Sequence, residues 1–150
     1  MWALAIIMVI SSFALGSGLP AVTNLAPTRA TVVAQQYESY RTQIVSYTKS
    51  HPGYQGSPSD SQLQQQGYLP PGWQGLSQGH GDDIKNGKAI IWAKVWPGSV
   101  KQSQHDCYVS GTKCLDSSGN VLLKNVPSSV PQNAIASLFN FTGGSGTNWF

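Results

Sequence analysis

Residues 1–15 of this chain carry no charged side chain and are almost entirely apolar. The chain that follows is polar, so a lipid bilayer is the partner that suits this segment. A membrane-spanning helix needs about 20 apolar residues, and the run reaches that length only by continuing through Pro20 to Val22. Trp2 stands where interfacial aromatic side chains are common. We therefore expect residues 1–22 to form a single-pass membrane anchor.

A cleaved signal peptide is the alternative interpretation of the same segment. Ala14 and Gly16 offer the small residues that precede a cleavage site. A signal peptide also has a basic region before its apolar core, whereas the first basic residue of this chain is Arg29. The uncleaved anchor is favoured, and cleavage remains open.

The composition is that of a polar chain with few charged residues. The chain has 150 residues, which suits one domain and a tether. Charged residues make up 10%, against roughly 25% in typical soluble domains. The net charge of +3 is spread along the chain without a cluster of Lys and Arg, which argues against nucleic-acid binding. This composition is common in exported proteins and differs from that of a cytosolic enzyme.

Two cysteines, Cys107 and Cys114, lie on either side of Gly111 in a stretch that predicts a tight hairpin. A disulfide between them closes a short loop and stabilises the fold by about 2 to 3 kcal/mol on the chain-entropy model. A metal site would need more ligands at a suitable spacing. Disulfides persist in oxidising compartments, so we expect the bulk of the chain to lie outside the cytoplasm.

Apolar residues recur at helical spacing in the segment 28–50, which predicts one long helix. Glu38 and Arg41 can pair on its wet side, and Pro52-Gly53 ends it. We expect the tyrosines of the apolar stripe to pack on a sheet while their hydroxyls reach water. The stripe consists of Val33, Tyr37, Tyr40, Ile44 and Tyr47.

The rest of the chain predicts a small antiparallel sheet at about 82–126, so the fold class is α+β. Asn86-Gly87 is a strong hairpin signal before an interior strand at 89–95. Pro131 can open a short helix at about 131–139. Residues 143–146 have linker composition, and Trp149-Phe150 beyond them can dock on the domain.

Between the helix and the sheet lies a loop rich in Gly and Pro. Large apolar residues recur in it at intervals that can pin it onto a core, and a short helical turn can form at 60–63. The five anchors are Tyr54, Leu63, Tyr68, Leu69 and Trp73.

Two groups of residues invite a catalytic interpretation. His105-Asp106-Cys107 contains a nucleophile next to a base, but Cys107 has a disulfide partner in Cys114. Asp60-Ser61 lies in a Pro/Ser loop, where a turn or a helix cap is the more common role. We expect no catalytic residue and no cofactor.

His80, Asp82 and Asp83 could donate to a metal ion. No second ligand group stands at a recognised spacing, and Gly79 and Gly81 mark a turn. We interpret the two aspartates as solvated turn residues before a strand, and we expect no metal site.

One stretch of the chain, residues 36–73, resembles the start of the PilM family, small inner-membrane proteins encoded with type IVb thin pili of conjugative plasmids. Gly87, Lys88 and Trp92 also agree with that family. The resemblance implies a pilin-like fold, in which the anchor at 1–22 is followed by a periplasmic domain at 23–150 that contains the long helix and the sheet. The motifs that carry it are Tyr37, Tyr40-Arg41, Val45-Ser46-Tyr47, His51-Pro52-Gly53-Tyr54-Gln55-Gly56, Asp60-Ser61, Leu63, Tyr68 and Pro70.

The family resemblance implies a structural role in pilus assembly at the bacterial inner membrane, through binding of other assembly proteins. Aromatic side chains dominate interface energetics, so we expect Tyr54, Tyr68, Trp73 and Trp96 to contact partners. We expect no nucleic-acid or small-molecule ligand.

The chain departs from true prepilins, which have a basic leader ending in Gly and a Glu five residues into the mature helix. Neither element occurs before Arg29. A minor pilin or adhesin-like subunit in the fibre is the alternative role, and a small secreted enzyme is a remote one.

Overall fold

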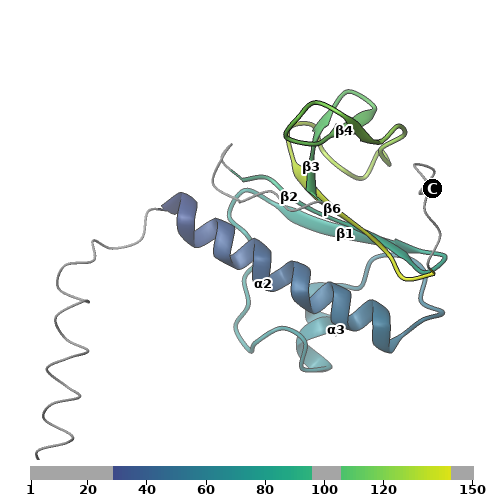
Figure 1. Ribbon diagram of the computed structural model, residues 1–150. Coiled ribbons are helices and arrows are strands. Elements are labelled where there is room, and N and C mark those ends of the chain that lie inside the picture. The colour runs from purple at the N-terminus through teal and green to yellow at the C-terminus, as the bar shows by residue number, and fades with distance from the viewer. Residues whose placement is uncertain (1–28, 96–105, 143–150) are drawn as a thin grey trace, which may run out of the picture.

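The computed structural model describes residues 29–95 and 106–142 of the chain. Its fold is α+β, with two helices and one antiparallel sheet in the described residues (Figure 1). The elements are α2 (Arg29–Ser50), α3 (Asp60–Gln65), β1 (His80–Lys85), β2 (Lys88–Ala93), β3 (Asp106–Ser110), β4 (Lys113–Leu115), β5 (Val121–Leu123) and β6 (Ile135–Asn140).

Helix α2 corresponds to the helix predicted at 28–50, and it packs across one face of the sheet (Figure 1). All five residues of the predicted apolar stripe are at most 3% exposed. In the described residues, no helix is long and apolar enough to cross a membrane. The anchor predicted at residues 1–22 lies outside the described residues.

The sheet has the strand order β1-β2-β6-β3-β4-β5, and every neighbouring pair is antiparallel. It therefore extends beyond the predicted range of 82–126. The helix predicted at 131–139 is wrong, because these residues lead into β6, which pairs with β2 on one side and β3 on the other. A short apolar run fits a buried helix as well as an interior strand, and β6 is buried on both faces from Ile135 to Leu138.

The predicted Asn86-Gly87 hairpin is confirmed. Lys85 pairs with Lys88, which leaves the two residues Asn86 and Gly87 as the turn. Both have positive φ, 52° and 70°, as a type I′ turn requires. The turn joins β1 to β2, and β2 also pairs with β6 on its other side. It is therefore an interior strand, as the sequence predicted.

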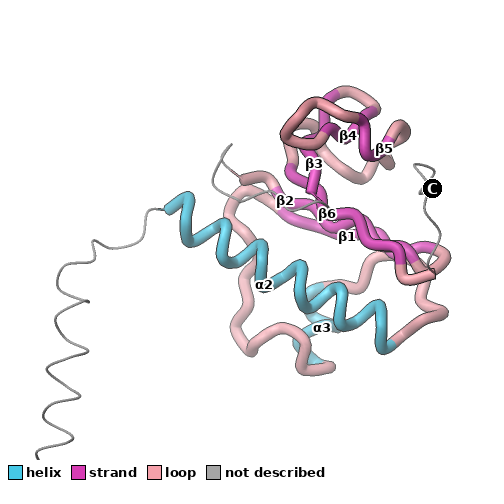
Figure 2. Tube along the Cα trace, in the orientation of Figure 1, coloured by secondary structure: helices cyan, strands magenta, loops and turns pink. Residues whose placement is uncertain are grey.

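Strands β3, β4 and β5 form a lobe on the side of the sheet away from the helices (Figure 2). The predicted disulfide between Cys107 and Cys114 is present, with the two Cα atoms 5.3 Å apart, and it joins β3 to β4. This lobe and the outer sides of β2 and β6 share a second apolar core, separate from the core beneath α2. It contains Ile90, Cys107, Val109, Cys114, Leu123, Val130, Ala134, Ala136 and Leu138.

The segment between α2 and β1, residues 51–79, folds against the helix side of the sheet and contains α3. Ser59 caps α3 by accepting a hydrogen bond from the Gln62 N–H at 3.1 Å. Leu63 and Leu69 are at most 2% exposed, while Tyr54, Tyr68 and Trp73 pack half-buried on the same core. The predicted anchors therefore pin this segment, which we call the α2–β1 loop.

Candidate functional site

The polar chemistry of the described residues gathers where three tyrosines of α2 meet the sheet. Tyr37, Tyr40 and Tyr47 are at most 1% exposed, so the expectation that their hydroxyls reach water is wrong. Each hydroxyl has a protein partner instead. This follows from the cost of burying a polar group without a hydrogen bond.

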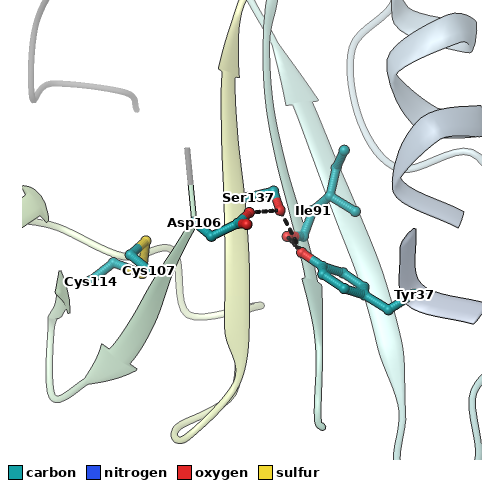
Figure 3. The surroundings of a disulfide bond; sticks show 6 residues. All are labelled: Tyr37, Ile91, Asp106, Cys107, Cys114 and Ser137. Carbon is teal, nitrogen blue, oxygen red and sulfur yellow. Dashed lines mark hydrogen bonds between the residues drawn. A yellow bond between two sulfur atoms is a disulfide. The ribbon is translucent and has the colours of Figure 1, made fainter. Parts of the chain in front are cut away.

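Tyr37 starts a network that crosses from α2 to the far strands of the sheet (Figure 3). Its hydroxyl donates to the Ile91 carbonyl oxygen at 3.1 Å and lies 2.7 Å from Ser137 Oγ. Ser137 Oγ donates in turn to Asp106, which is fully buried. Burial raises the pKa of Tyr37, so its hydroxyl keeps its proton.

Arg41 forms an ion pair with the buried carboxylate of Asp106. Its Nη1 donates to both carboxylate oxygens of Asp106 at 3.0 and 3.1 Å. Its Nη2 donates to Glu38 at 3.0 Å, which is the pair expected from the sequence. On strand β3, Asp106 faces α2 while its neighbour Cys107 faces the lobe (Figure 3). The helix, the sheet and the disulfide lobe are thus joined at one strand.

Asp82 is a second buried carboxylate, and no Lys or Arg among the described residues forms an ion pair with it. It is 5% exposed and lies in β1, so its interpretation as a solvated turn residue is wrong. Oδ1 accepts from Ser57 Oγ at 2.7 Å and from the Tyr40 hydroxyl at 3.1 Å, whereas Oδ2 is buried without a partner. Burial raises the pKa of Asp82 to about 7.

Asp60, Trp73 and His80 form a third group, which ties α3 to β1. Asp60 Oδ2 lies 3.0 Å from His80 Nε2 and accepts from Trp73 Nε1 at 3.0 Å. The Leu76 N–H donates to His80 Nδ1 at 3.2 Å, so Nδ1 is the acceptor and Nε2 carries the proton. The rings of Trp73 and His80 also contact Tyr40, at 6.0 and 4.6 Å between centroids.

Tyr47 is the centre of an aromatic cluster at the end of α2. His51 stacks on it with 4.2 Å between ring centroids, and Tyr54 and Tyr68 meet it edge-on at 5.1 and 5.3 Å. Gln62 Nε2 of α3 donates to the Tyr47 hydroxyl at 3.0 Å. Three of the four predicted partner-binding residues lie on the α2–β1 loop and pack on the core: Tyr54 and Tyr68 contact Tyr47, whereas Trp73 contacts Tyr40.

The fourth predicted residue, Trp96, lies outside the described residues, as does His105. Cys107 is in its disulfide and Asp106 is bound to Arg41, so neither is available as a nucleophile or a base in this arrangement. Both ring nitrogens of His80 are likewise occupied. Among residues 29–95 and 106–142, no cluster of three His, Cys, Asp or Glu side chains could hold a metal ion.

Sequence reasoning missed the polar side chains that face the tyrosines, above all Asp82, Asp106 and Ser137. A signal for Asp82 was present, because residues two apart on a strand share a face and Ile84 faces the core. Asp106 had no such signal, since its partner Arg41 is 65 residues away in sequence. In the described residues, these polar side chains connect α2 to β1, β3 and β6.

The PilM family model matches residues 5–138, which is most of the chain. No curated protein and no solved structure matches it.

Proposed function

Because the chain belongs to the PilM family, we propose that it is a structural component of the type IV pilus assembly apparatus of the bacterial inner membrane. The family match carries this proposal. It begins at residue 5, inside the apolar segment, and ends at residue 138 in β6. The match includes most of the apolar segment and most of the described domain, and this extent supports the proposal of a tethered protein.

In this proposal, residues 1–22 cross the membrane once and residues 23–150 lie in the periplasm. The Cys107–Cys114 disulfide supports that placement, because disulfides persist in oxidising compartments. Alkaline extraction of isolated membranes tests the anchor. We expect the full chain to stay in the pellet and a chain lacking residues 1–22 to be released. Release of both chains would contradict the anchor.

The chain acts by protein–protein binding, through the outer surface of the α2–β1 loop. Its aromatic anchors fix the loop before any partner arrives, and a preorganised surface loses less entropy on binding. Loops on a rigid scaffold are also where binding residues concentrate. Gln65 and Gln66, at the end of α3, are exposed on this loop. No bond-making step, metal or cofactor is part of the proposed role.

Site-specific photo-crosslinking in cells that assemble the pilus tests this surface. A photoreactive residue at Gln65 or Gln66 is expected to form adducts with other pilus-assembly proteins. The matched control is the same residue at Lys124, which is exposed beside β5 in the lobe on the other side of the sheet. Adducts at Lys124 and none at the two glutamines would contradict the loop as the contact surface.

A minor pilin or adhesin-like subunit is the second candidate. The observation that favours it is the long helix α2 packed on an antiparallel sheet, which is compatible with a pilin-like body whose helix continues from the anchor. Fractionation separates the two roles. Recovery of the chain in sheared, purified pili supports the fibre subunit, whereas recovery only in membranes supports the assembly component.

A further inference from the structure

A short segment of the α2–β1 loop, residues 55–58, runs along the outer edge of β1, and we call it the strap. Gly56 makes an isolated antiparallel bridge with Ile84. The Gly56 N–H donates to the Ile84 carbonyl oxygen at 2.7 Å, and the Ile84 N–H donates to the Gly56 carbonyl oxygen at 2.9 Å. Pro58 has no N–H to donate, so the strap does not continue this pairing as a strand.

Side chains hold the strap on either side of this bridge. Gln55 Oε1 accepts from the Asn86 N–H in the β1–β2 turn at 3.3 Å. Ser57 Oγ donates to Asp82 Oδ1 at 2.7 Å. Gln55 and Ser57 are exposed, whereas Asp82 is 5% exposed. The strap therefore lies between the Asp82 carboxyl group and solvent.

The groups around Asp82 compensate an ionised carboxylate poorly. Burial, and to a smaller extent the negative charges of Asp83 and Asp60, raise the pKa of Asp82 to about 7. Its cross-strand neighbour on β2, Ile91, is apolar. The titratable groups near Asp82 are Tyr40 and Tyr47 on α2, Asp60 at the start of α3, and Asp83 and His80 on β1.

Hydration of this carboxylate requires a movement, and the strap is the element that can make it. A carboxylate has about four acceptor sites, yet among the described residues Oδ2 of Asp82 has no donor. On the helix side, Tyr40 is 1% exposed and its ring contacts those of Trp73 and His80. On the strap side, the Ser57 hydroxyl supplies one hydrogen bond, which water can replace. Lifting the strap thus hydrates Asp82 without moving α2.

We propose that the strap, residues 55–58, is a pH-sensitive cover that lifts from the edge of β1 when Asp82 loses its proton. Lifting breaks the bridge between Gly56 and Ile84 and exposes the Ile84 N–H and carbonyl oxygen at the sheet edge. This device is additional to the role in pilus assembly, and its test needs no pilus protein.

The direction of the effect follows from proton linkage. With the strap closed the pKa of Asp82 is about 7, and hydration in the lifted state moves it toward the ordinary value of 3.8. The closed state therefore binds the proton more tightly. The fraction of lifted strap rises with pH between these two values, by up to about tenfold per pH unit, and stops rising above about pH 7.

Amide hydrogen exchange of the full chain in detergent, followed by NMR, tests the proposal through the Gly56 N–H. After correction for the intrinsic pH dependence of exchange, we expect the protection factor of Gly56 to fall by about tenfold or more from pH 5 to pH 7. Low urea concentrations are expected to leave this exchange unchanged, because a local opening exposes little surface, whereas global unfolding exposes much.

Three substitutions assign the effect to Asp82. Asp82→Asn is expected to abolish the pH dependence of Gly56 protection while His80 stays in place. Asp83→Asn, on the adjacent residue, is the matched control and is expected to retain the pH dependence. Ser57→Ala, at an exposed position, removes a hydrogen bond that lowers the pKa of Asp82, so the fall in protection is expected to move to higher pH.

Four results would each overturn the proposal. They are protection of Gly56 that does not change with pH, a pH dependence that persists in Asp82→Asn, a transition that Ser57→Ala does not move, and exchange of Gly56 that urea accelerates as it does global unfolding. The Ser57→Ala result decides the matter even if Asp82→Asn does not fold, because Ser57 is exposed.

Discussion

Two buried aspartates under α2 are held in different ways. Asp106 accepts from Arg41 Nη1 on both carboxylate oxygens and from the Ser137 hydroxyl. Among the described residues, Asp82 accepts from the hydroxyls of Ser57 and Tyr40 alone, and its second oxygen has no hydrogen-bond partner. A hydroxyl compensates a buried charge less well than a guanidinium does, so the protonation of Asp82 depends on pH near neutrality.

The first prediction concerns the effect of Asp82 on stability. Its pKa is about 7 in the folded chain and near 3.8 when unfolded, so the native state binds the proton more tightly. Stability then falls as pH rises between these values, and the loss is complete above about pH 7. We expect the free energy of unfolding to drop by about 3 kcal/mol from pH 5 to pH 8 because of this group.

Urea denaturation of the full chain and of Asp82→Asn at both pH values measures this effect. The variant is expected to lose that component of the pH dependence, because the amide does not titrate. Parallel pH profiles for the two chains would show that Asp82 does not titrate in this range.

The second prediction concerns Arg41. Its loss breaks the ion pair with the buried Asp106, and breaking a buried ion pair typically costs about 3 to 5 kcal/mol. Arg41→Ala is therefore expected to lower the free energy of unfolding by about 3 kcal/mol in urea denaturation. Glu38→Ala is the matched control, because the Glu38 side chain is 47% exposed and such pairs contribute less than about 1 kcal/mol. Equal losses in the two variants would contradict a special role for Asp106.

At the scale of elements, the periodic segments were predicted well and the isolated apolar run was not. Helix α2 and the Asn86-Gly87 hairpin have local signals, a helical stripe and a turn that needs positive φ. Strand β6 has none, since Ile135 to Leu138 are buried on both faces by strands and side chains from elsewhere. Its place between β2 and β3 is a tertiary fact.

The third prediction concerns the β1–β2 pair. Gly81 lies opposite Trp92, and a Cβ on Gly81 would come within 2.6 Å of the indole ring. We expect Gly81→Ala to raise the free energy of the folded state by about 1 to 3 kcal/mol through overpacking. Trp92→Leu removes the ring, so the same substitution in that background is expected to cost much less. A thermal unfolding cycle of the four chains measures this coupling, and additive effects would argue against the contact.

At the scale of the whole molecule, one sheet joins two apolar cores. Ile91 and Ile135 face α2, while Ile90 and Leu138 on the same strands face the disulfide lobe. Because β2 and β6 contribute to both cores, loss of one side exposes residues of the other. We expect the described domain to unfold as one cooperative unit.

The fourth prediction tests that unit through the disulfide. Replacing Cys107 and Cys114 with Ser is expected to lower the free energy of unfolding by about 2 to 3 kcal/mol, because the loop between them is short. The far-UV signal of the helix and the near-UV signal of the tyrosines beneath it should shift together. Separate transitions would show that the lobe and the helix side unfold independently.

The sequence alone determined the features that depend on residues close together in the chain. These are the helix at Arg29–Ser50, the Asn86-Gly87 turn, the cystine hairpin and the likeness to the PilM family. Only the tertiary structure decided the order of the strands, the burial of Asp82 and the pairing of Arg41 with Asp106. The physical reason is that a buried polar group needs a partner, and a partner many residues away leaves no local pattern in the sequence.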